Sequence, residues 1–357
     1  MKIMGNVTKF FFREIVSPRI FVMDKPGIVY NVLASKYSTN TAKKRVVFHF
    51  EDIEAHLEYA AEKKLGKKTA SSLFYRYGKE SGMRYMLTGG KKKIPSWKIP
   101  VLVDFIFSAY KMAGMSFAEN VFYDNEIIQL KGWNNVGCRK TANPSYFAGV
   151  VAGIMTYLIG KNVEAFESCE CPKCSIVAKP VSKAFHLVNE NDLLPMTGYS
   201  KYNFPNEDLK TGFCSLTDLI KFKKIDFGEK HCFKYKNQVL IPIEAGMIEL
   251  IFEHYKNAGL KEFAGQEIIR GAEILAEKIN VGELKNLKNI LSAFGYGIPE
   301  VKVKNKISVS LYNAPVCKYG FYYHAYIING LLNYVYGKKF ELLELSTIKS
   351  NTYITYG

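Results

Sequence analysis

The feature that most limits how this chain can fold is an internal repeat. Val46–Glu51 aligns with Val239–Glu244 at an offset of 193 residues, and Gly160 aligns with Gly337 at an offset of 177 residues. Blocks between these two keep the same order, and the offset only decreases along the chain, as differences in loop length would produce. The sequence therefore predicts two copies of one folding unit.

The repeat divides the chain into four parts. We interpret residues 46–179 as the first copy and residues 239–357 as the second, degenerate copy. Segments 1–45 and 180–238 align with neither copy, so we interpret them as an N-terminal extension and a connecting elaboration. Apolar residues make up 48% of the chain and aromatic residues 14%, which is typical of a folded protein.

Each copy shows the same order of expected elements. A strand comes first, three helices and a β-hairpin follow, and a buried helix and two closing strands end the copy. In the first copy the expected helices are 52–65, 69–86, 96–112 and 144–159. Gly78 and Gly82 lie one turn apart on the second of these, a spacing that lets another backbone approach closely. We therefore predict an α+β fold, with two antiparallel-sheet-plus-helices copies forming an internal pseudo-dimer.

The sharpest chemical feature is a cysteine cluster near the end of the first copy. Cys169, Cys171 and Cys174 fall within six residues in a tight turn between two strands. Thiols at this spacing can converge on a zinc ion, which takes four ligands in structural sites. Cys138, just before the buried helix, is a candidate for the fourth ligand, and Glu167 is an oxygen alternative.

Only the first copy is expected to bind this metal. The equivalent positions of the second copy hold no cysteine: they are Ser346, Ile348 and Asn351. Two other readings of the cluster are open, namely adventitious thiols in a turn and a redox pair at Cys171 and Cys174. A redox pair lacks the surrounding βαβ pattern of thioredoxin-like proteins, so we favour structural zinc.

Several short motifs resemble the 4-vinyl reductase domain family. Tyr146–Gly153, then Gly160–Val163, then the cluster ending at Cys174 resemble the end of that domain, and Leu73–Gly82 resembles its early helix. The resemblance covers most of the first copy and, more weakly, the second. It implies an α+β fold related to trafficking-complex subunits of the TRAPP type, which tends to form dimers. A tandem chain could form such a dimer within itself, and it could also assemble as a homo-oligomer.

The resemblance also implies a function. In the sensor portions of phenol-responsive transcription activators, this domain binds a small aromatic ligand in a buried pocket, beside a zinc ion held by Cys and Glu. By resemblance the metal ligands here would be Glu167, Cys169 or Cys171, and Cys174. The sequence departs from the family in its contracted cysteine spacing, and Cys138 lies several residues earlier than the family's upstream cysteine.

Four aromatic residues are candidates for a ligand pocket. The resemblance places Trp133 at a pocket-lining strand position, with Tyr312 as its counterpart in the second copy. Tyr146 and Tyr326 lie on the buried helices of the two copies. A Trp on a hairpin strand is more often a core or interface residue than a ligand contact, so both interpretations stay open.

The charge suggests a rival function. The formal net charge is +16, and a basic surface attracts nucleic acid or acidic partners. The lysines fall in short scattered clusters, however, without a recognition helix or an RNA-binding signature. A solvated basic surface is the simpler interpretation, and a nucleic-acid-associated regulator that uses the pseudo-dimer as its binding surface is the alternative.

No reaction centre is evident in the sequence. It contains no nucleophile elbow, phosphate-binding loop or dinucleotide fingerprint, and none of its histidines forms a metal-binding pair on a helix. We expect His324, for example, to be a satisfied core or surface residue. The longest apolar run, 146–160, is too short to span a bilayer, and no signal peptide is evident. We therefore expect a cytoplasmic, non-catalytic protein that binds a hydrophobic small molecule.

Overall fold

The structure is a computed structural model of the 357-residue chain. It describes residues 21–31, 44–87, 94–170, 173–188, 212–227, 232–315, 319–348 and 351–357. The fold is α+β, as predicted, and all the strand pairs within its sheets are antiparallel. Among the described residues, no helix is both long enough and apolar enough to cross a membrane.

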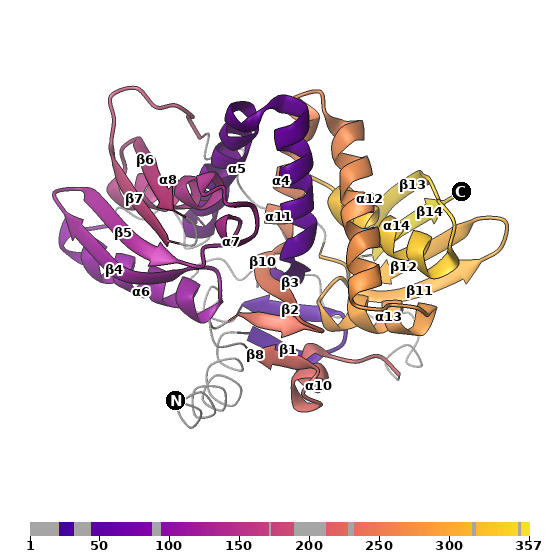
Figure 1. The fold of residues 1–357 in the computed structure, drawn as a ribbon. Coiled ribbons are helices and arrows are strands. Elements are labelled where there is room, and N and C mark those ends of the chain that lie inside the picture. The colour runs from indigo at the N-terminus through magenta and orange to yellow at the C-terminus, as the bar shows by residue number, and fades with distance from the viewer. Residues whose placement is uncertain are drawn as a thin grey trace.

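Three sheets organise the molecule (Figure 1). The central sheet has the order β1-β2-β3-β10-β9-β8, and it is flanked by two four-stranded sheets of the orders β4-β5-β7-β6 and β11-β12-β14-β13. The strands of the central sheet are β1 (Phe21–Lys25), β2 (Ile28–Asn31), β3 (Lys44–Phe50), β8 (Ile225–Phe227), β9 (Phe233–Tyr235) and β10 (Gln238–Glu244). Those of the flanking sheets are β4 (Phe117–Asp124), β5 (Ile127–Trp133), β6 (Val163–Glu170), β7 (Lys173–Pro180), β11 (Ile298–Val303), β12 (Ile307–Tyr312), β13 (Leu342–Ile348) and β14 (Asn351–Tyr356).

Helices fill the space between the flanking sheets. In Figure 1, α4, α5, α11 and α12 stand above the central sheet, and α8 and α14 lie against the two flanking sheets. The helices of the first half are α4 (Glu51–Leu65), α5 (Lys67–Leu87), α6 (Ile99–Met112), α7 (Cys138–Thr141) and α8 (Ser145–Ile159), with a 3₁₀ turn, η2 (Ser96–Lys98), before α6. Those that follow are α10 (Leu216–Lys221), α11 (Ala245–Asn257), α12 (Lys261–Lys278), α13 (Leu284–Ala293) and α14 (Tyr322–Tyr336).

The two halves meet through equivalent strands. β3 pairs with β10, placing Val47 opposite Ile243 and Phe50 opposite Leu240. At the repeat offset of 193 residues, Leu240 is the counterpart of Val47 and Ile243 is the counterpart of Phe50. Each contact therefore occurs twice with its partners exchanged, as at a two-fold dimer interface. This register gives the predicted pseudo-dimer its geometry, and one hydrophobic core runs through both halves.

The structural repeat begins upstream of the sequence repeat. β1 and β2 form a hairpin beside β3, and β8 and β9 form one beside β10. The segments before the two copies, which sequence comparison left unaligned, thus supply matching edges to the central sheet. Their strands are only three to five residues long, so little sequence pattern marks them.

Glycines let α5 and α8 pack with their backbones in contact. A Cβ added to Gly78 or Gly82 would clash with the carbonyl oxygen of Tyr146 or Val150, respectively, and one added to Gly153 would clash with that of Lys79. The predicted close approach at Gly78 and Gly82 is confirmed. The second half keeps part of it, since a Cβ on Gly330 would clash with the carbonyl oxygen of Ile269. A Cβ on Gly271, the sequence counterpart of Gly78, would instead meet only the side chain of His56 on α4, at 3.3 Å.

This difference makes a matched pair of substitutions. We expect Gly78→Ala to lower the free energy of unfolding by about 1–3 kcal/mol, because the backbone of α8 must move away. Gly271→Ala should change it by less than about 1 kcal/mol, since the gain in helix propensity offsets a tight side-chain contact. Urea denaturation of both variants measures the difference, and equal losses would contradict the packing described here.

Candidate functional site

Buried polar side chains from both halves gather where the halves meet. We call this set the central polar cluster, and its members are His49, Glu54, Glu58, Tyr77, Tyr146, Glu249, Tyr255, Tyr296, Tyr323 and His324. They come from β3, α4, α5, α8, α11, α14 and the loop after α13. All are at most 9% exposed, so their polar atoms are shielded from bulk water and need partners within the protein or from a bound molecule.

Glu249 organises one side of the cluster. Its carboxylate accepts hydrogen bonds from the backbone N–H groups of Tyr323 and His324, at 3.0 and 3.2 Å, at the start of α14. It also lies 2.5 Å from Nδ1 of His324. The ring of Phe321 stacks on His324 with 4.6 Å between centroids. The imidazole is thereby fixed in orientation, while its Nε2 has no hydrogen-bond partner among the described residues.

His49 is the least satisfied member. It is fully buried on β3, and neither ring nitrogen has a partner in the described part of the chain. Burial, and then the charge of nearby His324, lower the pKa of His49 to about 3. The imidazole is therefore neutral at pH 7, with one N–H donor and one acceptor nitrogen. The ring centroid of Tyr323 lies 5.7 Å away, and its hydroxyl likewise has no partner in the residues that the structure describes.

The two cluster carboxyls on α4, those of Glu54 and Glu58, are protonated at neutral pH. Burial, and then the charge of Glu51, raise the pKa of Glu54 to about 8. Burial likewise raises the pKa of Glu58 to about 8, against a 2.8 Å hydrogen bond from Thr141. A protonated carboxyl can donate as well as accept a hydrogen bond, and Oε1 of Glu54 has no partner among the described residues.

These properties define what the cluster can bind. At neutral pH it presents the neutral imidazole of His49, the protonated carboxyls of Glu54 and Glu58, and tyrosine hydroxyls, among aromatic rings. The Glu249 carboxylate is already engaged by the start of α14. Unpartnered buried donors and acceptors cost free energy unless water or a ligand satisfies them. The arrangement suits a small uncharged molecule with a hydroxyl or carbonyl group and a flat apolar body.

The predicted pocket residues fall in different places. Tyr146 belongs to the cluster, where its ring stacks on Tyr77 with 4.9 Å between centroids. Tyr312 is half-buried at the end of β12, and its hydroxyl donates to Glu300 at 2.8 Å. Tyr326 packs against Phe252 at 5.4 Å between centroids. The backbone of Trp133 ends β5 opposite Lys173, and its side chain lies outside the described part.

Two of the predicted metal ligands are brought together. Cys138 begins α7 and Cys174 lies on β7, and both are buried. Their sulfur atoms are 3.3 Å apart, well beyond the disulfide bond length of about 2.05 Å. The backbone register pairs Cys169 with Cys174. Cys174 is also disulfide-bonded.

The remaining predicted ligands do not complete a site within the described part. Cys171 and the side chain of Cys169 lie outside it. Glu167 is exposed on β6, where its Oε1 accepts a hydrogen bond from Ser145 at 3.1 Å. Among the described residues, no group of three or more His, Cys, Asp and Glu side chains could hold a metal ion.

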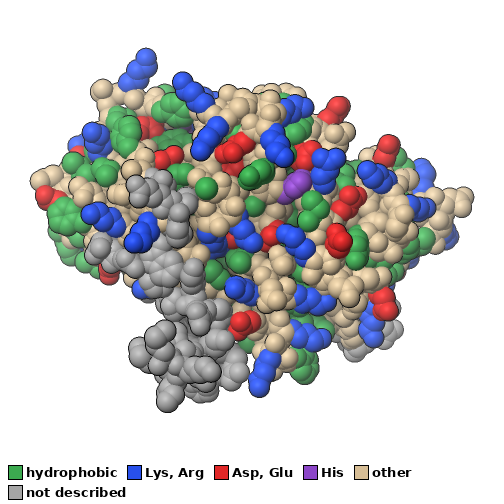
Figure 2. Space-filling view, viewed as in Figure 1, with side chains coloured by type: hydrophobic (Ala, Val, Ile, Leu, Met, Phe, Trp, Pro, Cys, Tyr) green, Lys and Arg blue, Asp and Glu red, His purple; other side chains and the backbone are tan. Residues whose placement is uncertain are grey.

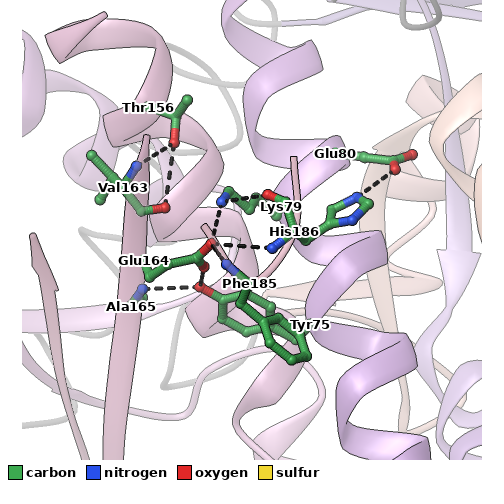
Figure 3. A network of polar contacts seen from close by, with 9 residues as sticks. All are labelled: Tyr75, Lys79, Glu80, Thr156, Val163, Glu164, Ala165, Phe185 and His186. Carbon is green, nitrogen blue, oxygen red and sulfur yellow. Dashed lines mark hydrogen bonds and ion pairs between the residues drawn. The ribbon is translucent and has the colours of Figure 1, made fainter. Parts of the chain in front are cut away.

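A second buried network, which the sequence did not reveal, ties α5 to β6 (Figure 3). Nζ of Lys79 lies 2.7 Å from Oε1 of Glu164, and both side chains are buried. Tyr75 donates to the other carboxylate oxygen, and the N–H groups of Phe185 and His186 donate to Oε1 at 2.7 and 3.2 Å. Burial raises the pKa of Glu164, but its bonds with Lys79 and Tyr75 outweigh that effect and lower the pKa.

The same segment is fixed to the second half through Glu80. One oxygen of Glu80 lies 2.7 Å from Nε2 of His186, and the other lies 3.0 Å from Nε2 of His254 on α11. Burial raises the pKa of Glu80, but the two histidines outweigh it and lower the pKa to about 2. Residues 181–188 therefore link β7 to both halves of the molecule.

Comparisons with known proteins give little further guidance. No family model matches the chain, and no curated protein matches it. Among solved structures, the phenol-responsive sensory domain of the transcription activator PoxR, crystallised with phenol, matches with 15% identity and a TM-score of 0.33. The match covers 43% of this chain and 80% of that one. A likeness of this size carries no argument about fold or function.

Proposed function

We propose that this protein is a non-catalytic regulatory protein that binds a small molecule at the central polar cluster. The observation that supports this most directly is a set of polar atoms on His49, Glu54, Tyr323 and His324 that have no partner within the described segments, all buried between the two halves. A ligand that bonds these atoms would contact both halves at once. Its binding would therefore stabilise their mutual arrangement, which is how occupancy of the site could be signalled.

The ligand class follows from the protonation states. With Glu54 protonated and His49 neutral at pH 7, neither of these two groups offers an opposite charge to a charged ligand. Aromatic rings, including Phe321 and Tyr296, surround His324 at centroid distances of 4.6 and 5.1 Å. We infer a hydroxylated aromatic or similarly flat molecule, and phenol is the simplest probe.

Two tyrosine variants test the ligand site. We expect Tyr323→Phe to leave stability unchanged or higher, because the hydroxyl has no partner among the described residues, and to weaken phenol binding roughly tenfold through the lost hydrogen bond. Tyr356→Phe is the matched control, since its buried hydroxyl donates to the carbonyl of Ala325 at 2.8 Å. That variant should lose about 1 kcal/mol of stability and bind phenol normally.

Calorimetric titration with phenol, together with thermal unfolding, measures both properties. Benzoate serves as a charged analogue that should bind more weakly. No detectable phenol binding, or equal binding by wild type and Tyr323→Phe, would contradict the proposed site and would indicate that water satisfies the cluster.

We also propose that the cysteine cluster of the first half holds a structural zinc ion. Once Cys174 is reduced, Cys138 and Cys174 would fit such a site, because both are buried and their sulfurs lie 3.3 Å apart. Sulfurs around tetrahedral zinc lie roughly 3.8 Å apart, from Zn–S distances of about 2.3 Å. Cys169 or Cys171, with Glu167 as an oxygen alternative, would complete the coordination. When bound, the ion would join α7 to the β6–β7 turn.

Zinc content and stability test this site. In protein kept reduced, we expect about one zinc per chain, because zinc prefers thiolate ligands. Cys138→Ser and Cys174→Ser should each lose the metal and melt at a lower temperature. Cys214 is free and half-buried, so Cys214→Ser should change neither the zinc content nor the melting temperature. Zinc-free protein whose mass rises on reduction would show a disulfide in place of the metal.

A further inference from the structure

A groove with basic walls lies between α4 and α12, on the surface where the two halves meet. Its volume is about 580 Å³, within the range of small-ligand sites. α4 contributes His56, Tyr59, Lys63 and Lys64, and α12 contributes the facing wall. We call it the interhelix groove. None of its lining residues belongs to the central polar cluster, so it is a separate site.

The lining carries more positive than negative charge. Five basic side chains line it: Lys63, Lys64, Lys140, Arg270 and Lys278. Against them stand two carboxylates, Asp52 and Glu267, so the excess is three positive charges. In Figure 2, basic side chains lie at several points along the face where Figure 1 shows α4 and α12.

Salt bridges hold part of this charge in place. Lys140 and Lys278 each lie 3.2 Å from Asp52, while His56 lies 2.9 Å from Glu267. Gly271 lets the helices approach here, since a Cβ on it would meet His56 at 3.3 Å. The two carboxylates are thus engaged with groove residues, and they leave the charge of the remaining lysines uncompensated.

Lys63 and Lys64 are those remaining lysines. Neither forms an ion pair with a carboxylate in the described part of the chain. Instead Nζ of Lys63 lies 5.5 Å from the ring centroid of Tyr59, and Nζ of Lys64 lies 4.4 Å from that of Phe263. Tyr59 is 55% exposed. Uncompensated cations beside an exposed ring can hold a phosphate and stack a base.

We propose that the interhelix groove binds a nucleotide unit, with its phosphate at Lys63 and Lys64 and its base on the ring of Tyr59. The charge excess selects an anion, the exposed ring selects a flat partner, and the groove volume limits the ligand to about the size of one nucleotide. The chemistry is the same for a free nucleotide and for a unit of single-stranded nucleic acid, and salt dependence distinguishes the two.

The phosphate contact is tested by charge removal. Calorimetric titration of the full chain with adenosine monophosphate and with a six-nucleotide single-stranded DNA should show binding of at least one of them at low salt. The double variant Lys63→Ala/Lys64→Ala should weaken it roughly tenfold or more. Lys304→Ala/Lys306→Ala removes the same charge from the exposed β11–β12 turn and should bind normally.

The base contact is tested by ring removal. Tyr59→Ala should weaken nucleotide binding roughly tenfold and leave binding of inorganic pyrophosphate unchanged. Phe122→Ala is the matched control, because this residue on β4 is 58% exposed and lies outside the groove. Tighter binding of the six-nucleotide strand, with a steep salt dependence, would identify single-stranded nucleic acid as the ligand. Equal affinities for the strand and for adenosine monophosphate would identify a free nucleotide. Absence of binding, or equal losses in the two lysine double variants, would overturn the proposal.

Discussion

Glu164→Gln is expected to lower the free energy of unfolding by about 3–5 kcal/mol, because it leaves the Lys79 ammonium buried without a counter-charge. The side chain of Lys79 is only 1% exposed and lies 2.7 Å from Glu164. Burial already lowers the pKa of Lys79, against the hydrogen bond and charge of Glu164. The variant also weakens the acceptor for the N–H groups of Phe185 and His186, so hydrogen exchange at these two amides should become faster.

Glu126→Gln provides the control for that prediction. Glu126 also lies 2.7 Å from a lysine, Lys161, but the side chains are 41% and 58% exposed. Exposed pairs of this kind contribute about 0–1 kcal/mol, so this variant should be nearly as stable as the wild type. Chemical denaturation of the two variants isolates the effect of burial at equal distance. Losses of the same size would contradict the role of Glu164 in joining α5, β6 and residues 181–188.

Glu54→Gln is expected to remove a large part of the pH dependence of stability on the alkaline side. The folded pKa of Glu54, and that of Glu58, is about 8 against an ordinary value of 4.5. A raised carboxyl pKa contributes stability that is complete below pH 4.5 and is lost as the pH rises to about 8. Each carboxyl should thus lower the free energy of unfolding of the wild type by up to about 1.4 kcal/mol per pH unit over that range.

The window between pH 6.5 and 8 isolates this effect. The pKa of His49 is lowered from 6.5 to about 3, so its contribution to stability grows between pH 3 and 6.5 and is constant above that. Urea denaturation across the window should show the free energy of unfolding of the wild type falling as the pH rises. The slope should be roughly half as steep for Glu54→Gln, and the double variant Glu54→Gln/Glu58→Gln should show almost no slope. A wild-type free energy that stays constant across the window would contradict the protonated carboxyls in the cluster.

Much of the architecture could be predicted from the repeat. Helix α14 occupies residues 322–336, the range expected from its counterpart, and α8 begins at Ser145, one residue from the predicted start. Equivalent glycines, Gly160 and Gly337, end these helices with φ values of 72° and 63°, where other residues are strained. The edge hairpins β1–β2 and β8–β9 were missed, because their strands are short and share no alignable residues.

The site was harder to predict than the fold. His49 and His324 lie 275 positions apart in the sequence, and only the pairing of the halves brings them into one cluster. His324 was expected to be a satisfied residue, yet only its Nδ1 has a partner in the described part of the chain. One signal was available: Glu51, Glu54 and Glu58 recur at helical spacing on the face of α4 that also carries Leu57 and Ala61. Carboxyls on an apolar face indicate a buried polar site.

The most direct test of the central claim is mass spectrometry of freshly purified, reduced protein, first under native and then under denaturing conditions. If the central polar cluster binds a small molecule, the native mass should exceed the sequence mass by one organic ligand per chain, or should do so after incubation with phenol, and denaturation should release it. A native mass that equals the chain with or without a metal ion, and that phenol does not change, would contradict the claim.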